Sequence, residues 1–277
     1  MSDGLRLDGA DPSAGLPAAS VLELDYLVRS YEVEASGELR LVTLLRMLQE
    51  AAWRHASLLG KGFTNRSDGA WYWVLSRLRV KMDTYPRWGE QFTVRTFPVG
   101  TERLLALREF VIRSAAGTVI GSAATGWLIV DGGTGRPVRP ERIVDDLTVH
   151  QRGFDGSLAR LDEPGPGRTV GPFPVRRHDI DQYHHVNNAS YLEWVLDALD
   201  PSRTDEHRVA ELGMDFLGET RPGDGYLVRI DSRVTEDRFE VARESDGKPS
   251  VRGCLRWVET DAAPGFRTAV DHPGGRR

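Results

Sequence analysis

The sequence predicts an α+β fold made of two similar units, each with an antiparallel sheet curled around one long helix. Three observations lead to this prediction. Two stretches of the chain align with each other, each stretch holds an amphipathic helix followed by alternating strands, and a segment rich in proline and glycine separates them. The 277 residues also suit about two domains. A sheet that wraps the helix buries the apolar faces of both.

The repeat consists of two ungapped alignments. Residues 31–51 align with 178–198 at an offset of 147, and residues 78–95 align with 212–229 at an offset of 134. The difference of 13 residues is a longer connection between helix and strand in the first copy. Few positions are identical, but acidic, apolar and glycine positions coincide. The alignment indicates duplication of one supersecondary unit.

Each copy contains one predicted long helix. In the first copy, apolar residues recur at helical spacing over 41–59, and Gly60 suits the C-terminal stop. In the second copy, Asn188 is the predicted N-cap and Pro201 the predicted end.

The segments after each helix predict strands and tight turns. Along 225–234 the residues alternate, and the inward set is Tyr226, Val228, Ile230 and Val234. Residues 116–117 and 245–248 are predicted hairpin turns.

The domain boundaries follow from composition. We expect a first unit over 21–150 and a second over 175–260, joined by a linker over 151–174 that packs across a surface. Residues 1–20 and 261–277 are expected to be flexible tails.

Composition excludes several classes of function. The net charge is −5 with no basic block, which argues against nucleic acid as the main partner. No apolar run reaches the ~18 residues of a membrane span, and the N-terminus lacks the features of a secretory signal. The single cysteine, Cys254, excludes a disulfide framework and indicates a reducing, cytoplasmic setting.

Common catalytic motifs are missing. The sequence has no G-x-S-x-G elbow, no Walker A loop and no G-x-G-x-x-G fingerprint. Alternation places Cys254 on the outer face of a strand, opposite Val251, Leu255 and Trp257. Histidines and aspartates at 178–185 fit no helical metal-binding spacing, so no metal is expected.

A polar cluster precedes the second helix. His185, Asn187 and Asn188 lie where free backbone N–H groups of a helix start could hold a carbonyl oxygen that gains charge during nucleophilic attack. The alternative is that the asparagines only cap the helix and the histidine is a surface residue. The first copy has Glu38 and Leu41 in place of His185 and Asn188, so the cluster is peculiar to the second copy.

The segment DIDQYHHVNNASYLEW resembles the D-x-D-x-N-x-H-V-N-N-x-x-Y-x-x-W signature of acyl-acyl-carrier-protein (acyl-ACP) thioesterases. Residues 73–97 and the stretch from Arg29 to Gly60 are similar to that family's strand-and-turn segment and first helix, so the resemblance covers about 25–260. It implies a tandem double hot-dog fold, with acyl-chain binding in the first domain and catalysis in the second. The implied reaction is hydrolysis of fatty acyl-ACP to free fatty acid, without a cofactor.

The resemblance also implies the site. Asp181, His185 and Glu219 match the family's catalytic positions, and Thr220 stands where the family has a cysteine. This favours water as the nucleophile over a Cys–His mechanism. Tyr183 replaces a family asparagine. Tyr183, Thr220 and the two asparagines Asn187 and Asn188 are the expected substrate-binding residues.

Three other functions stay open. They are an acyl-CoA thioesterase on the same fold, a hot-dog hydratase or dehydratase, and a non-catalytic acyl-binding protein. The sequence leaves acyl length, carrier, pathway and oligomeric state undetermined, with a homodimer among the options.

Overall fold

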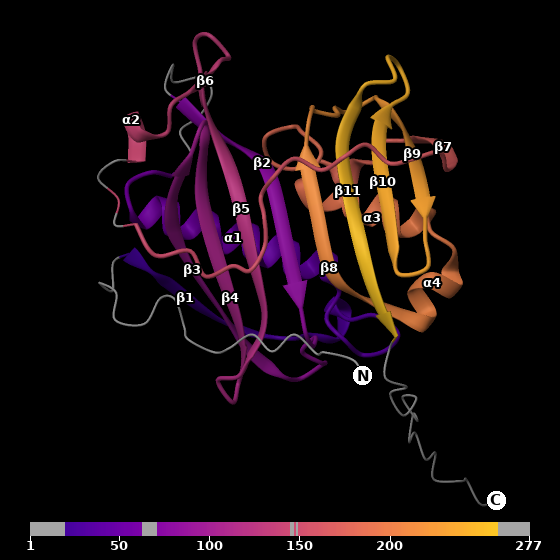
Figure 1. The fold of residues 1–277 in the computed structure, drawn as a ribbon, viewed down its shortest axis with the longest axis horizontal. Coiled ribbons are helices and arrows are strands. Elements are labelled where there is room, and N and C mark those ends of the chain that lie inside the picture. Colours follow the sequence, from indigo (N-terminus) through magenta and orange to yellow (C-terminus); the bar gives the residue numbers. More distant parts are fainter. Residues whose placement is uncertain (1–19, 63–70, 145–146, 148, 260–277) are drawn as a thin grey trace, which may run out of the picture.

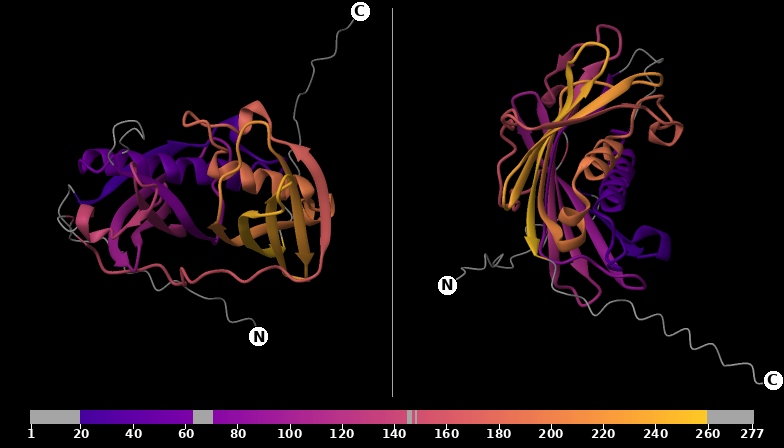
Figure 2. Two further views of the ribbon diagram at one scale, coloured as in Figure 1. Left: turned by 90° about the horizontal axis from the view of Figure 1, so that it is seen from above. Right: turned by 90° about the vertical axis from the view of Figure 1, so that its right-hand side faces the viewer.

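The computed structural model describes residues 20–62, 71–144, 147 and 149–259. One curved antiparallel sheet carries the long helices on one face, while the 151–167 segment runs along the other (Figures 1 and 2). The expected flexible tails fall outside the described residues, apart from Ser20. None of the described helices is both long and apolar enough to cross a membrane.

The two halves repeat the same order of elements. The first half contains β1 (Leu22–Leu27), η2 (Ser30–Glu32), α1 (Leu41–Leu58), β2 (Trp71–Met82), β3 (Gln91–Glu102), β4 (Leu105–Ser114), β5 (Val119–Asp131), β6 (Pro137–Val138) and α2 (Glu141–Val144). The second half contains β7 (Arg168–Pro174), η4 (Arg177–Asp179), α3 (Asn188–Ala198), α4 (Pro201–Glu206), β8 (His207–Phe216), β9 (Gly225–Ser232), β10 (Glu236–Arg243) and β11 (Pro249–Glu259).

The halves join edge to edge. The strand order is β1-β3-β4-β5-β2-β8-β11-β10-β9-β7, so the β2–β8 pair links them. In that pair Arg79 lies opposite Gly213, which is its own equivalent at the offset of 134. On the helices, Arg46 of α1 pairs at 2.9 Å with Glu193 of α3, its equivalent at the offset of 147. Residues that meet their own equivalents lie on a two-fold axis, so the predicted copies are related by pseudo-two-fold symmetry.

The helices agree with the prediction except at the ends of the second. Helix α1 ends before Gly60, whose φ of +68° suits a helix stop. The N-cap of α3 is Asn187, not Asn188, because the Asn187 side chain accepts the Ala189 N–H at 3.0 Å. Pro201 begins the short helix α4 instead of merely ending α3, since proline is well suited to a first helical turn.

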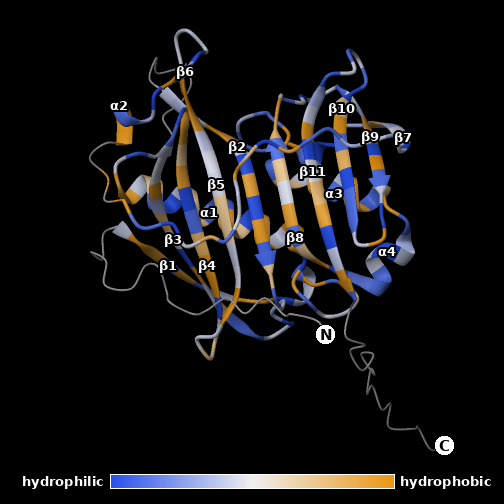
Figure 3. Ribbon diagram, viewed as in Figure 1, coloured by the Kyte–Doolittle hydropathy of each residue, from blue (hydrophilic) through white to orange (hydrophobic). Residues whose placement is uncertain are grey.

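The strands alternate as predicted (Figure 3). Tyr226, Val228 and Ile230 of β9 are buried against the helices. Val234 was wrongly assigned to this face: it lies beyond β9 and is 87% exposed. The turns at 116–117 and 245–248 connect β4 to β5 and β10 to β11, as expected.

The expected linker has two parts. Residues 168–174 are not linker but the edge strand β7, paired with β9. Its prolines fit because an edge strand does not need every N–H for the ladder. The remaining part, residues 151–167, which we call the strap, crosses the outer face of the sheet (Figure 2).

Charged side chains on the outer face hold the strap. Asp215 of β8 accepts the Leu161 N–H at 2.7 Å and pairs at 2.9 Å with Arg79, which also donates to the strap. Glu109 of β4 accepts the N–H groups of Gly153 and Phe154 at 2.8 and 3.0 Å. The charges on this sheet face are therefore covered by the connection between the halves.

Glu109→Gln is expected to stabilise the protein at neutral pH. Burial raises the pKa of Glu109 in spite of its two backbone partners, so the folded state favours the protonated form. The stability that protonated Glu109 contributes to the folded state is complete below its unfolded pKa of about 4.3. It is lost as pH rises through the higher folded pKa. We expect a gain in unfolding free energy on the order of 0.5 kcal/mol at neutral pH, and none in acid, allowing for solvent screening. Urea unfolding at both pH values measures it, and a less stable variant at neutral pH would contradict it.

Candidate active site

The turn before α3 carries the predicted polar cluster. The Asp181 N–H donates to the His185 carbonyl at 2.9 Å, and the Asp181 carboxylate accepts the N–H groups of Tyr183 at 2.8 Å and His185 at 3.3 Å. His184 has a φ of +60°, a left-handed conformation that is uncommon outside glycine. Its equivalent in the first copy is Gly37, with a φ of +82°. The turn is thus a shared fold element, and side chains distinguish the second copy.

His185 meets Glu219 across the site. The His185 Nε2 atom lies 3.4 Å from Glu219 Oε2, although the two residues are 34 positions apart in sequence. The same carboxylate oxygen accepts from Arg221 at 3.1 Å, and the Glu219 carbonyl accepts from Arg243 at 2.8 Å. Both side chains of the pair are partly exposed, at 28% and 41%. A histidine and a carboxylate held together and open to solvent can handle a proton from water.

The start of α3 differs from the expectation. The Ala189 N–H, one of the donors at this helix start, is not free to hold a carbonyl oxygen, because it donates to Asn187 Oδ1. The Asn188 amide instead reaches across to α1, where its Nδ2 donates to Gln49 Oε1 at 3.2 Å. Asn187 and Asn188 therefore have distinct positions: the first caps the helix, and the second links the two halves beside the site.

Thr220 is placed inside the protein. It is 1% exposed, its hydroxyl lies 2.8 Å from the Ser250 hydroxyl, and its N–H donates to the Tyr191 hydroxyl at 3.1 Å. Its carbonyl accepts the Val186 N–H at 3.2 Å. Although it borders the cavity described next, its side chain is engaged with the interior. We therefore interpret Thr220 as a residue that positions Glu219 beside the turn.

A cavity of about 770 Å³ opens at this cluster and draws its walls from both halves. Asp181, Tyr183, His185 and Glu219 border it, and Tyr183 is 41% exposed. From there the cavity extends under α1 and over the first half of the sheet, along Ala52, Trp53, Ala56, Leu59, Trp73, Leu75, Trp127 and Leu128. Its size and apolar lining suit a lipid-like ligand.

The unequal lengths of the helices explain why the cavity lies in the first half. Helix α1 has 18 residues and α3 has 11, and the end of α3 at Ala198 corresponds to Ala51. The cavity-lining residues Ala52 and Ala56 lie in the extra turns of α1, and their small side chains leave space beneath the helix. In the second half, Tyr191, Trp194 and Tyr226 pack together below α3.

Comparisons with known proteins agree with this architecture. Residues 20–149 match the acyl-ACP thioesterase N-terminal domain, and residues 166–257 match the acyl-ACP thioesterase C-terminal domain. The chain belongs to the acyl-ACP thioesterase family. The predicted family and the tandem double hot-dog fold are thereby confirmed.

Relatives of this acyl-ACP thioesterase family member come from bacteria and plants. It is similar to the crystal structure of an acyl-ACP thioesterase from Bacteroides thetaiotaomicron, with 25% identity, a TM-score of 0.78 and coverage of 86% of this chain and 98% of that one. The 12:0-ACP thioesterase from Umbellularia californica has the same fold, with 20% identity, a TM-score of 0.78 and coverage of 89% and 100%. The oleoyl-ACP thioesterase 1, chloroplastic, of Arabidopsis thaliana is 27% identical over 219 residues, which are 72% of this chain and 60% of that protein. The chain spans about three fifths of the length of the curated relatives it matches.

Sequence reasoning missed several residues of the site. Gln49 and Arg221 contact the predicted residues, and Arg108 lines the cavity. Arg108 had a sequence signal, because it occupies an inward position on a strand between apolar residues of the same face, Ala106 and Phe110. Gln49 and Arg221 had none, since their contacts depend on how distant segments pack.

Proposed function

We propose that this chain hydrolyses the thioester of fatty acyl-ACP to release free fatty acid. The observation that carries the proposal is the His185–Glu219 pair at the mouth of a mostly apolar cavity. A thioester held at the pair places its acyl chain in the cavity, and family membership supports the same reaction. Acyl-chain binding by the first unit and catalysis by the second belong to this proposal.

The proposed chemistry uses water as the nucleophile. Glu219 accepts a proton from water while the water oxygen attacks the thioester carbonyl carbon. The tetrahedral intermediate then breaks its C–S bond, and protonated His185 donates a proton to the departing thiolate, so that acid and thiol are the products. The proton that Glu219 took from water passes to His185 across their 3.4 Å contact, which restores both groups. Asp181 acts as a positioning residue, because its carboxylate holds the backbone N–H of His185.

Neither cysteine nor threonine is suited to replace water. Cys254 lies on the outer face of β11, paired with Gly213 of β8, and burial raises the pKa of its thiol. The Thr220 hydroxyl is engaged with Ser250 in the interior. Tyr183 borders the cavity at the family's asparagine position, and we propose that its hydroxyl contacts the substrate.

The carrier and setting are further parts of the proposal. We propose ACP as the partner and the cytoplasm as the location, in keeping with a single cysteine among 277 residues. Strand β2 of the first half pairs with β8 of the second half, so the two halves of one chain assemble the site together. A homodimer stays a prediction.

The direct test is product analysis with acyl-ACPs of graded length, beside acyl-CoAs of the same lengths. We expect free fatty acid from acyl-ACP, with a maximum at one chain length set by the cavity, and slower release from acyl-CoA. Release of fatty acid from acyl-CoA but not from acyl-ACP would show that CoA, and not ACP, is the carrier. Tight acyl-ACP binding without free acid, or hydration of an enoyl thioester, would contradict the hydrolase.

A further inference from the structure

One wall of the cavity carries a buried, positively charged side chain. Arg108 of β4 lines the cavity and is 8% exposed. Its Nη1 atom lies 2.8 Å from His55 Nδ1 of α1 and 3.1 Å from the hydroxyl of Thr96 on β3. Within the described part of the chain, no carboxylate forms an ion pair with it.

The contacts of Arg108 leave most of its donors unused. A guanidinium has five N–H donors, and both contacts fall on one nitrogen. Nε and Nη2 make no hydrogen bond to any described residue, and neither atom is fully buried. Burial also lowers the pKa of Arg108 to about 10, because removal from water disfavours its charged form.

The position of Arg108 fixes which part of a ligand it would meet. The strands β8, β2, β5 and β4 lie in that order, and the paired row runs from Met214 through Leu78 and Thr125 to Arg108. Three steps between strands of about 4.8 Å place Arg108 roughly 14 Å from the strand that leads to Glu219. It therefore faces the distal part of an acyl chain and not the carbons beside the thioester.

We propose that Arg108 forms a binding subsite for an oxygen on the distal part of the acyl chain. The substrate class would be acyl thioesters whose chain ends in, or carries near its end, a hydroxyl or carboxyl group. Such an oxygen accepts from Nε and Nη2, where a methyl end would leave the cation facing hydrocarbon. The proposal rests on the proposed function, because it takes the cavity to hold the acyl chain.

A purely structural role would not need this arrangement. Joining α1 to the sheet requires one hydrogen bond to His55, which a neutral side chain can provide without burying a charge. Arg108 lines the cavity, and the two nitrogens without a partner among the described residues, Nε and Nη2, are not fully buried.

The test measures binding of non-hydrolysable acyl-pantetheine amides of graded length by calorimetry. Each length ends in a methyl, a hydroxyl or a carboxylate. At the length that reaches Arg108, the oxygen-ended forms should bind about ten- to a hundredfold more tightly than the methyl form. In Arg108→Met, the ratio of the affinity for the oxygen-ended forms to that for the methyl form should fall to about one. Arg113→Met, the same change at the partly exposed end of β4, should leave it unchanged.

Each outcome separates this inference from the proposed function. Equal binding at every length in the wild type overturns the subsite even if plain acyl-ACPs are hydrolysed, and so does a ratio that persists in Arg108→Met. A high ratio without hydrolysis of any acyl-ACP supports the subsite and contradicts the hydrolase. If Arg108→Met does not fold, Arg108→Lys should keep the preference for the carboxylate, and its loss there would count against the proposal.

Discussion

His185→Ala and Glu219→Gln should each lower kcat/KM for acyl-ACP hydrolysis by about 100- to 10,000-fold, the range for loss of a general acid or base. The two groups lie 3.4 Å apart, and Glu219 is also held by Arg221. Removing either member leaves the other without its partner for proton transfer. The double variant should lose little more than the worse single variant, because residues that act as a unit are not additive.

The controls are chosen on neighbouring elements. His178→Ala removes a histidine whose side chain is 76% exposed, and Glu193→Gln removes the exposed carboxylate that pairs with Arg46. Both should keep nearly full activity. Steady-state kinetics with one acyl-ACP checks all variants, and unfolding curves show that they are folded. Activity near the wild-type level in both His185→Ala and Glu219→Gln would rule out the proposed chemistry.

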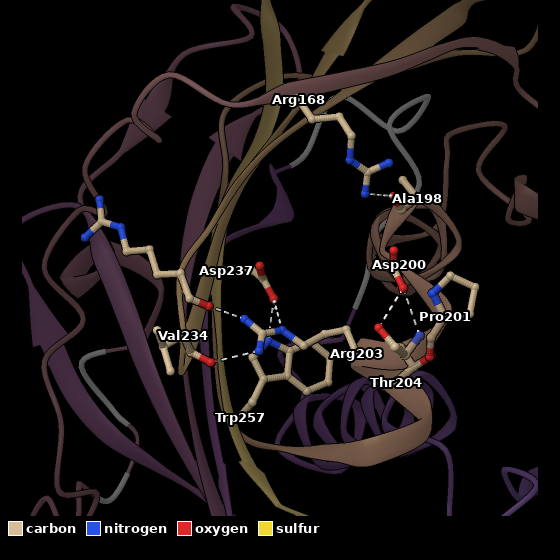
Figure 4. Close-up of polar contacts among 11 residues, drawn as sticks. Arg168, Ala198, Asp200, Pro201, Arg203, Thr204, Val234, Asp237 and Trp257 are labelled. Carbon is tan, nitrogen blue, oxygen red and sulfur yellow. Dashed lines mark hydrogen bonds and ion pairs between the residues drawn. The ribbon is translucent and has the colours of Figure 1, made fainter.

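Arg203→Met should destabilise the protein by about 3–5 kcal/mol, because it leaves a buried carboxylate without its cation. Figure 4 shows this contact, in which Arg203 of α4 donates from Nε to Asp237 of β10 at 2.9 Å. Asp237 is 0% exposed and also accepts from the Trp257 indole at 2.6 Å. Arg203 donates further to the carbonyls of Val234 and Arg233. One side chain thus joins α4 to the strand edge.

A second substitution tests the cause. Asp237→Asn in the Arg203→Met background removes the uncompensated charge, and we expect it to restore part of the lost stability. Arg256→Met is the control, since its pairing with Glu211 is exposed and such pairs contribute only about 0–1 kcal/mol. Chemical unfolding of the four proteins measures the differences. An Arg203→Met protein as stable as Arg256→Met would show that the contact contributes little.

Local patterns sufficed for much of the fold. Helical periodicity and Gly60 predicted α1, and alternation predicted the inward residues of β9. The errors lie where tertiary contacts decide the outcome. The prolines of 168–174 suggested a linker, but an unpaired edge beside β9 accommodates them in a strand. Asn187 and Asn188 are both good caps, and only the packing of Asn188 against Gln49 separates their positions.

In the site, too, some features follow from the sequence and others only from tertiary packing. Sequence spacing keeps Asp181 and His185, which the family resemblance implied as site residues, close together, since five consecutive residues cannot lie far apart. It did not show that Glu219 approaches His185, that Thr220 turns inward, or that Arg108 faces the cavity. Those placements depend on β8 and β4 packing against helices that are distant in sequence.

The sequence by itself determined the duplication, the family and the copy that carries the polar cluster, because residue type and spacing are local properties. The tertiary structure alone decided where the cavity lies. Helix α1 is longer than α3, small residues line its extra turns, and the rings of Tyr191, Trp194 and Tyr226 pack together in the second half. Empty space is a property of packed elements taken together, and no single stretch of sequence encodes it.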